Sequence, residues 1–241
     1  MTSEPEADAP AVTRSSRRTA KSTKQQLPLW VHFLLALVLV ALLRNFVAQS
    51  FYVPSGSMIP TLEVGDRVVV SKLSNDVTRG DIVVFNGTDT FAAGTPERFT
   101  GTFGKAAAAV ASVFGVHLNE RDYVKRVIGM PGDHVVCCDA QGKITINDTV
   151  INESYLVGGM QPSLQPFDVR VPAGRLWMMG DNRSNSADSR AHLGDPGGGM
   201  VPVTDVIGRP VFRYWPLGRM GTTGSYASDA ELAKIPAAAT K

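Results

Sequence analysis

The sequence predicts a mostly β protein, with an antiparallel, β-rich body preceded by one N-terminal transmembrane helix. Three observations predict this class. An unbroken apolar run extends from Leu29 to Leu43, short apolar segments separated by polar turns follow it, and no stretch alternates strands with helices as parallel βαβ units would. With 241 residues and 44% apolar content, the chain is long enough to bury one sizeable core.

Residues 1–28 are predicted to form a disordered basic tail. They are rich in Ser, Thr, Ala and Pro and contain too little apolar material to fold. The positive charges of this tail are concentrated at Arg14, Arg17, Arg18, Lys21 and Lys24. Because no aromatic residues alternate with these charges and a membrane span follows at once, no nucleic-acid binding is expected.

The predicted span covers residues 29–48. The run from Leu29 to Leu43 makes roughly 22 Å of helix, and continuing to Ala48 brings it to about 30 Å, the thickness of the hydrocarbon core. The basic tail predicts a cytoplasmic N-terminus, a single pass through the cell membrane and an extracytoplasmic body. A cleavable signal peptide is the alternative, and Arg44 and Phe46 fit poorly before a cleavage site that needs small residues.

Residues 49–220 are predicted to form the β-rich body. Strands are expected over 66–70, 81–85, 122–128, 134–138, 143–147, 149–151, 167–171, 176–179 and 206–214. A hairpin loop is expected over 139–142 and a tight turn at Asn147-Asp148.

Two segments depart from this rhythm of strands. Residues 86–120 form a variable insertion in which 105–118 have the pattern of a small-residue apolar helix, either leaning on the membrane surface or capping the core. Residues 221–241 contain no second span and are predicted to be a flexible tail.

The only cysteines, Cys137 and Cys138, are adjacent. Neighbours on a strand point to opposite faces, so one buried thiol and one surface thiol are expected, although a redox role is an alternative. No further Cys or His group has metal-ligand spacing, so no metal site and no cofactor are expected.

Two segments about seventy residues apart contain a candidate nucleophile and a candidate general base. Ser57 lies in Pro54-Ser55-Gly56-Ser57-Met58-Ile59-Pro60-Thr61-Leu62, and Lys125 lies in the apolar strand pattern of residues 123–129. A desolvated, neutral lysine can remove the proton of a serine hydroxyl, which predicts a Ser-Lys variant of nucleophilic catalysis. Taken separately, Ser57 is compatible with an ordinary turn and Lys125 with the exposed face of a strand.

A third segment, Met179 to Arg190, follows a predicted strand and is rich in polar residues. It is compatible with a solvated loop of Asx turns. In a functional interpretation, Asp188 and Arg190 form a charge-assisted pair that fixes the loop, and Ser186 lies near a buried amine.

The three segments together resemble the motif boxes of bacterial type I signal peptidases, also called leader peptidases. Residues 54–62 resemble the nucleophile box, with Gly65-Asp66 where the next box begins. Residues 125–133 resemble the lysine box, and residues 180–190 resemble the final box. The order of the boxes and the preceding apolar run agree with the family, so the resemblance covers roughly residues 29–216.

The resemblance implies a role for each of these positions. Ser57 would be the nucleophile and Lys125 the general base. The Ser55 hydroxyl and the Ser57 backbone N–H would form the oxyanion hole. Ser186 would orient the lysine amine, and Asp188 and Arg190 would support the loop by pairing.

The family also implies a function, namely a membrane-anchored serine endopeptidase that removes N-terminal signal peptides from exported preproteins at Ala-X-Ala sites. Two alternatives are a Ser-Lys autoprotease of the repressor type and a catalytically inactive, membrane-anchored β-domain that acts as a binding module. The expected partners are preprotein signal peptides and the lipid bilayer, and the sequence indicates no particular oligomeric state.

Overall fold

The structure is a computed structural model that describes residues 28–74, 76–92, 121–223 and 230–236, together with the single positions 102 and 104. The predicted basic tail up to residue 27, the predicted helix over 105–118 and most of the 86–120 insertion lie outside the described residues.

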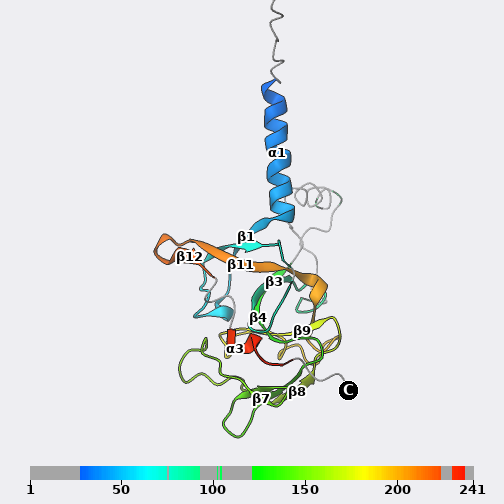
Figure 1. The fold of residues 1–241 in the computed structure, drawn as a ribbon, viewed down its shortest axis with the longest axis vertical. Coiled ribbons are helices and arrows are strands. Elements are labelled where there is room, and N and C mark those ends of the chain that lie inside the picture. The colour runs from blue at the N-terminus through cyan, green and yellow to red at the C-terminus, as the bar shows by residue number, and fades with distance from the viewer. Residues whose placement is uncertain are drawn as a thin grey trace, which may run out of the picture.

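An N-terminal helix, α1 (Leu29–Phe46), leads into the body and extends away from it (Figure 1). The chain leaves the helix at Val47, and Ala48 already pairs with Ser71 as the first residue of strand β1. The helix therefore ends two residues before the end of the predicted span over 29–48. Among the residues that the structure describes, no helix combines the length and the apolarity expected of a membrane span.

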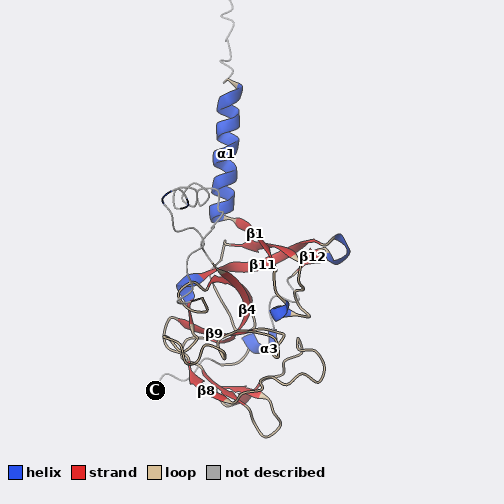
Figure 2. Cartoon of the chain, turned by 180° about the vertical axis from the view of Figure 1, so that it is seen from behind, coloured by secondary structure: helices blue, strands red, loops and turns tan. Residues whose placement is uncertain are grey.

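The body is built on a large antiparallel sheet, as predicted. In spatial order its strands are β1 (Ala48–Tyr52), β2 (Arg67–Ser71), β11 (Val206–Trp215), β3 (Ile82–Asn86), β4 (Asp122–Gly129), β9 (Arg175–Met179) and β10 (Val201–Pro202), with β12 (Gly221–Thr222) beside β11. Residues 82–85 of β3 are buried on both faces of the sheet, which explains their unbroken apolar sequence. Figure 2 shows this sheet curling around the middle of the body.

A second antiparallel sheet lies at the end of the body away from α1 (Figure 1). Its order is β7 (Thr149–Val150), β6 (Ile144–Ile146), β5 (His134–Cys137) and β8 (Phe167–Arg170). The tight turn predicted at Asn147-Asp148 joins β6 to β7, with φ of 49° and 64° at these residues. Both values lie in the left-handed region that a type I′ hairpin turn requires, and Asn and Asp tolerate that region better than most residues.

The main core joins the two sheets. Ile128 and Trp177 of the large sheet pack in one buried cluster with Val135 and Ile146 of the small sheet. A second cluster lies under the turn that follows β1 and contains Val53, together with side chains of β2 and β3. The first cluster holds the two sheets together, and the second anchors the segment that carries Ser57.

The chain beyond Met220, predicted to be a flexible tail, contributes two ordered pieces where the structure describes it. One is β12, and the other is the short helix α3 (Ala230–Ala233), drawn in red beside the main core in Figure 1. Leu232 is 1% exposed and belongs to the core that joins the sheets. Arg79 donates to the carbonyl of Ile235 at 2.6 Å, so this segment is docked by both apolar and polar contacts.

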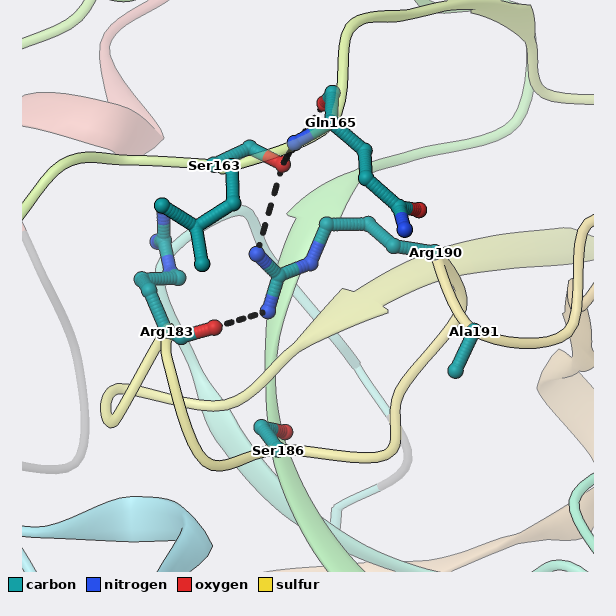
Figure 3. Close-up of a pocket in the computed structure, with 7 residues that line it drawn as sticks. Ser163, Gln165, Arg183, Ser186, Arg190 and Ala191 are labelled. Atoms are coloured by element: carbon teal, nitrogen blue, oxygen red, sulfur yellow. Dashed lines mark hydrogen bonds between the residues drawn. The ribbon is translucent and has the colours of Figure 1, made fainter.

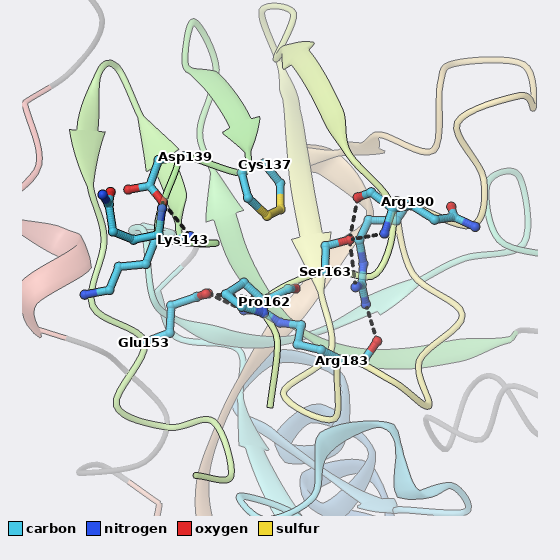
Figure 4. Close-up of a disulfide and its surroundings, with 11 residues drawn as sticks. Cys137, Asp139, Lys143, Glu153, Pro162, Ser163, Arg183 and Arg190 are labelled. Atoms are coloured by element: carbon cyan, nitrogen blue, oxygen red, sulfur yellow. Dashed lines mark hydrogen bonds and ion pairs between the residues drawn. A yellow bond between two sulfur atoms is a disulfide. The ribbon is translucent and has the colours of Figure 1, made fainter. Parts of the chain in front are cut away.

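The two cysteines correct an expectation from the sequence. Cys137 and Cys138 form a disulfide with each other instead of one buried and one surface thiol (Figure 4). Strand β5 ends at Cys137, so the strand alternation that would separate the two side chains does not extend to Cys138.

Candidate active site

Ser57 lies at the centre of a single 3₁₀ turn, η1 (Gly56–Met58), directly after β1. The neighbours Met58 and Leu62 are each 1% exposed and anchor the turn in the core beneath it. The Ile59 N–H donates to the carbonyl of Gly56 at 3.2 Å, which closes the turn. Ser57, which is itself only 9% exposed, is consequently fixed by the core beneath the turn.

Lys125 comes from the middle of β4, where its backbone pairs with Val83 of β3. It is 3% exposed. Its Nζ donates to Ser57 Oγ at 2.7 Å and to the carbonyl of Val124 at 3.1 Å. The two side chains that the sequence separates by 68 positions are therefore in direct hydrogen-bond contact.

The surroundings of Lys125 disfavour the charged form of its amine. Burial lowers the pKa of Lys125 from its ordinary value of 10.5 to about 8, against the opposing charges of Asp188 and Asp181. Burial is the larger effect, and each of the two carboxylates is also paired with an arginine.

The Ser55 hydroxyl lies beside the same oxygen. Ser55 Oγ is 3.4 Å from Ser57 Oγ, and the Ser55 side chain is exposed. If Ser57 Oγ attacked a carbonyl carbon, this hydroxyl and the backbone N–H of Ser57 would both lie next to the oxygen of that carbonyl. Donors in that position are the kind that stabilise an oxyanion.

The loop after β9 wraps around the serine turn. Asn182 donates from its backbone N–H to the carbonyl of Ser57 and from Nδ2 to the carbonyl of Gly56, both at 3.0 Å. A Cβ on Gly180 would lie 2.5 Å from the Ser57 carbonyl oxygen and would also collide with Ser186. A glycine is required at position 180 because the two backbones approach so closely.

The predicted Asp188–Arg190 pair is present in the structure. Nε and Nη2 of Arg190 donate to the two oxygens of Asp188 at 2.8 and 2.7 Å, and the Gly180 N–H donates to Asp188 at 2.9 Å. Burial raises the pKa of Asp188, but the hydrogen bonds and charge of Arg190 outweigh burial, so the pKa lies below its ordinary value. Figure 3 shows the same guanidinium reaching Ser163 and the carbonyl of Arg183, which braces the loop on two sides.

Ser186 lies on this loop with a buried Oγ, and its hydroxyl is one of the groups that lower the pKa of Asp188. Among the described residues the amine of Lys125 bonds to Ser57 and Val124, not to Ser186. Its hydroxyl nevertheless lies close to Gly180, whose own contact is with the Ser57 carbonyl.

A second buried ion pair was missed by the sequence reasoning. Arg126, the neighbour of Lys125, donates from Nε and Nη2 to the two oxygens of Asp181 at 2.8 and 2.7 Å, and Thr61 donates to Asp181 at 2.5 Å. Both charged side chains are at most 1% exposed. The signal in the sequence was an arginine inside an apolar strand, because a buried guanidinium requires a buried anion.

Comparison with known proteins assigns the family. A family model for signal peptidase, peptidase S26, matches residues 27–215. The chain belongs to this signal peptidase family. It is 38% identical over 193 residues to signal peptidase I of Leptolyngbya laminosa, which covers 79% of this chain and 80% of that protein. It is also 37% identical over 245 residues to signal peptidase I of Mycobacterium tuberculosis, and this alignment covers 91% of this chain and 82% of that protein.

A third relative is the probable signal peptidase I-2 of Synechocystis sp., 35% identical over 189 residues, which cover 77% of this chain and 72% of that one. The resemblance seen in the motif boxes is thereby confirmed, and the chain is a hydrolase of the peptidase class. Membership of the signal peptidase family supports signal-peptide cleavage by a serine peptidase.

Proposed function

We propose that this signal peptidase cleaves preproteins with a Ser57–Lys125 dyad, at sites with small residues of the Ala-X-Ala type. The observation that carries the proposal is the 2.7 Å contact between Ser57 Oγ and a lysine amine that is 3% exposed. A protonated lysine accepts no proton, so the dyad requires the desolvation seen around Lys125. The preference for small residues before the cut comes from the family resemblance.

In the first half-reaction, neutral Lys125 takes the proton of Ser57 as Oγ attacks the scissile carbonyl carbon. The resulting oxyanion accepts hydrogen bonds from the Ser57 N–H and the Ser55 hydroxyl. The ammonium of Lys125 then gives its proton to the leaving amine, and the C–N bond breaks to leave an ester on Ser57. The mature protein departs with a free N-terminus.

In the second half-reaction, Lys125 takes a proton from a water molecule that attacks the ester carbon. The same two donors hold the second oxyanion. Collapse of this intermediate breaks the bond to Ser57 Oγ, which regains its proton from Lys125. The signal peptide is released with a new carboxylate, and both side chains return to their starting state.

A cleavage assay across pH tests the dyad. With a pKa of about 8, only about one-tenth of Lys125 is neutral at pH 7, so kcat/KM of the wild type should rise about tenfold between pH 7 and 9. Ser57→Ala and Lys125→Ala should cleave a preprotein only at background. The controls Ser50→Ala and Lys143→Ala, at exposed positions, should keep wild-type rates. A Lys125→Ala enzyme of near-normal rate would refute the dyad.

The proposal includes anchoring through α1 in the cell membrane, with the N-terminus cytoplasmic and the body outside. Large apolar side chains are exposed along this helix, among them Trp30, Phe33 and Leu39 at 65%, 65% and 57%. Such a concentration of exposed apolar surface is unfavourable in water and favourable in lipid.

Fractionation tests the anchoring. Full-length protein should stay in the membrane pellet after alkaline carbonate extraction, and protease added to intact cells should digest the body and spare the basic N-terminal tail. Release by carbonate would contradict anchoring, and digestion of the tail alone would reverse the orientation.

A further inference from the structure

The loop between β7 and β8, which lies outside every motif box, contacts the loop after β9. The chain between β7 and β8 carries Glu153, whose carboxylate pairs with both terminal nitrogens of Arg183. These two side chains are only 4% and 1% exposed. Arg183 also donates to the carbonyl of Pro162, which lies beside it in Figure 4, and to that of Gly180, each at 3.0 Å. The loop from the small sheet is therefore tied to the residues that surround Ser57.

Tyr155, on the same loop, lies against two arginines. Its ring centroid is 4.0 Å from the guanidinium carbon of Arg126 and 5.7 Å from that of Arg183. Its hydroxyl donates to Glu153 at 2.7 Å and accepts from Arg183 at 3.1 Å. A guanidinium over an aromatic face gains most when water is excluded, and Arg126 is 1% exposed.

Arg126 connects this ring to the proposed base. It follows Lys125 on β4, and its guanidinium donates two hydrogen bonds to Asp181 and a third, at 2.7 Å, to the carbonyl of Gly80. Asp181 is one of the two carboxylates that raise the pKa of Lys125 against the larger, lowering effect of burial. The closer Arg126 lies to Asp181, the more of that carboxylate's field it cancels at Lys125.

The carboxylates that act on the amine are Asp188 and Asp181, both on the loop after β9. The titratable side chains packed around them are Arg183 and Arg190 of the same loop, Arg126 of β4, and Glu153 and Tyr155 of the loop between β7 and β8. Asp188 pairs with Arg190, and Glu153 pairs with Arg183. The Tyr155 ring lies closer to the cation of the Arg126–Asp181 pair, at 4.0 Å, than to that of the Arg183–Glu153 pair, at 5.7 Å.

We infer that Tyr155 is a positioning residue of the peptidase reaction: its ring holds Arg126 on Asp181 and so keeps the amine of Lys125 able to lose its proton. The inference rests on the proposed function, because it concerns the proposed base. Without the ring, water reaches the face of the guanidinium and the bond to Asp181 loosens. The less compensated carboxylate then stabilises the ammonium form of Lys125.

The pH dependence of kcat/KM of the full-length enzyme in detergent tests this inference. For Tyr155→Leu, the ascending limb of the profile should move to higher pH by about one unit, which lowers kcat/KM at pH 7 about tenfold and restores it at high pH. Tyr155→Phe keeps the ring and should keep the wild-type limb. If Tyr155→Leu does not fold, Tyr155→Met fills much of the volume without an aromatic face and carries the same expectation.

The control is Phe167→Leu, which loses an aromatic contact with Trp177 in the same core. This substitution should lower the melting temperature but leave the ascending limb of the kcat/KM pH profile at the wild-type pH. A Tyr155→Leu enzyme that is slower at every pH with an unmoved limb would show a merely structural role and overturn the inference. So would a Tyr155→Phe limb displaced as far as that of Tyr155→Leu.

The wild-type profile separates this failure from failure of the proposed function. If wild-type enzyme shows no ascending limb, the lysine base is refuted and the inference falls with it. If the limb is present in wild type and unmoved in Tyr155→Leu, the inference alone is overturned.

Discussion

Lys125 should lower the stability of the protein at neutral pH, because its amine is buried where water would otherwise solvate the charge. Its pKa lies near 8 instead of 10.5, and the side chain is 3% exposed. A difference of about 2.5 pKa units corresponds to about 3 kcal/mol between the two protonation states. Methionine has a similar volume and no charge, so Lys125→Met removes this penalty.

The sign of the effect follows from proton binding. Between about pH 8 and 10.5 the unfolded chain binds more protons at this lysine than the folded protein does, so the stability of the wild type rises with pH across this window. The penalty is fully present below about pH 8 and absent above about 10.5. Because Lys125→Met also loses the hydrogen bonds to Ser57 and Val124, we expect a gain of about 1–3 kcal/mol at pH 7.

The assay is urea unfolding of both full-length proteins in one detergent at pH 7 and pH 10. The excess stability of Lys125→Met should shrink by about 2 kcal/mol at pH 10, while the variant is inactive at both. Lys143→Met, at an exposed lysine, is the control and should show no comparable pH-dependent difference. A Lys125→Met protein that is less stable than wild type at pH 7, or a difference that does not change with pH, would refute a desolvated amine.

Three further predictions concern the surroundings of Ser57 and the C-terminal segment. Ser55→Ala should lower kcat about 10²-fold with little change in KM, and an effect on KM alone would contradict an oxyanion role. Arg190→Met leaves the buried carboxylate of Asp188 without its cation and should cost about 3–5 kcal/mol in denaturant unfolding, whereas a loss below about 1 kcal/mol would show that the pair is unimportant. Leu232→Ala should lower stability by about 2–4 kcal/mol because its side chain is 1% exposed, and an unchanged melting temperature would mean that the segment is not docked in solution.

Most strands of the body could be predicted because each is a short apolar segment bounded by turn residues. The expected strand over 206–214 is Val206–Trp215, and that over 122–128 is Asp122–Gly129. Strand β1 was missed because Ala48 continues the apolar run of the preceding helix, and only pairing with β2 makes it a strand. The two-residue strands β10 and β12 carry no periodicity that a sequence pattern could reveal.

The chemistry of the site could be anticipated where local composition was unusual. The pairing of Asp188 with Arg190 was predictable, because oppositely charged residues two apart in a tight loop reach each other without help from the rest of the fold. The Arg126–Asp181 pair and the cover by Tyr155 were not anticipated, since they join three separate segments. For the cysteines the local pattern gave a wrong prediction of two separate thiols, because strand alternation was applied to Cys138, one residue beyond the end of β5.

By itself, the sequence determined which residue types are available: a serine on a tight turn, a lysine inside an apolar strand and a polar loop after another strand. Those are local properties, set by turn chemistry and side-chain periodicity. Only the tertiary structure decided that Ser57 and Lys125 meet at 2.7 Å and that the amine is shielded from water. Contact and desolvation depend on how strands distant in the chain pair and pack, and the ionisation of a lysine depends on both.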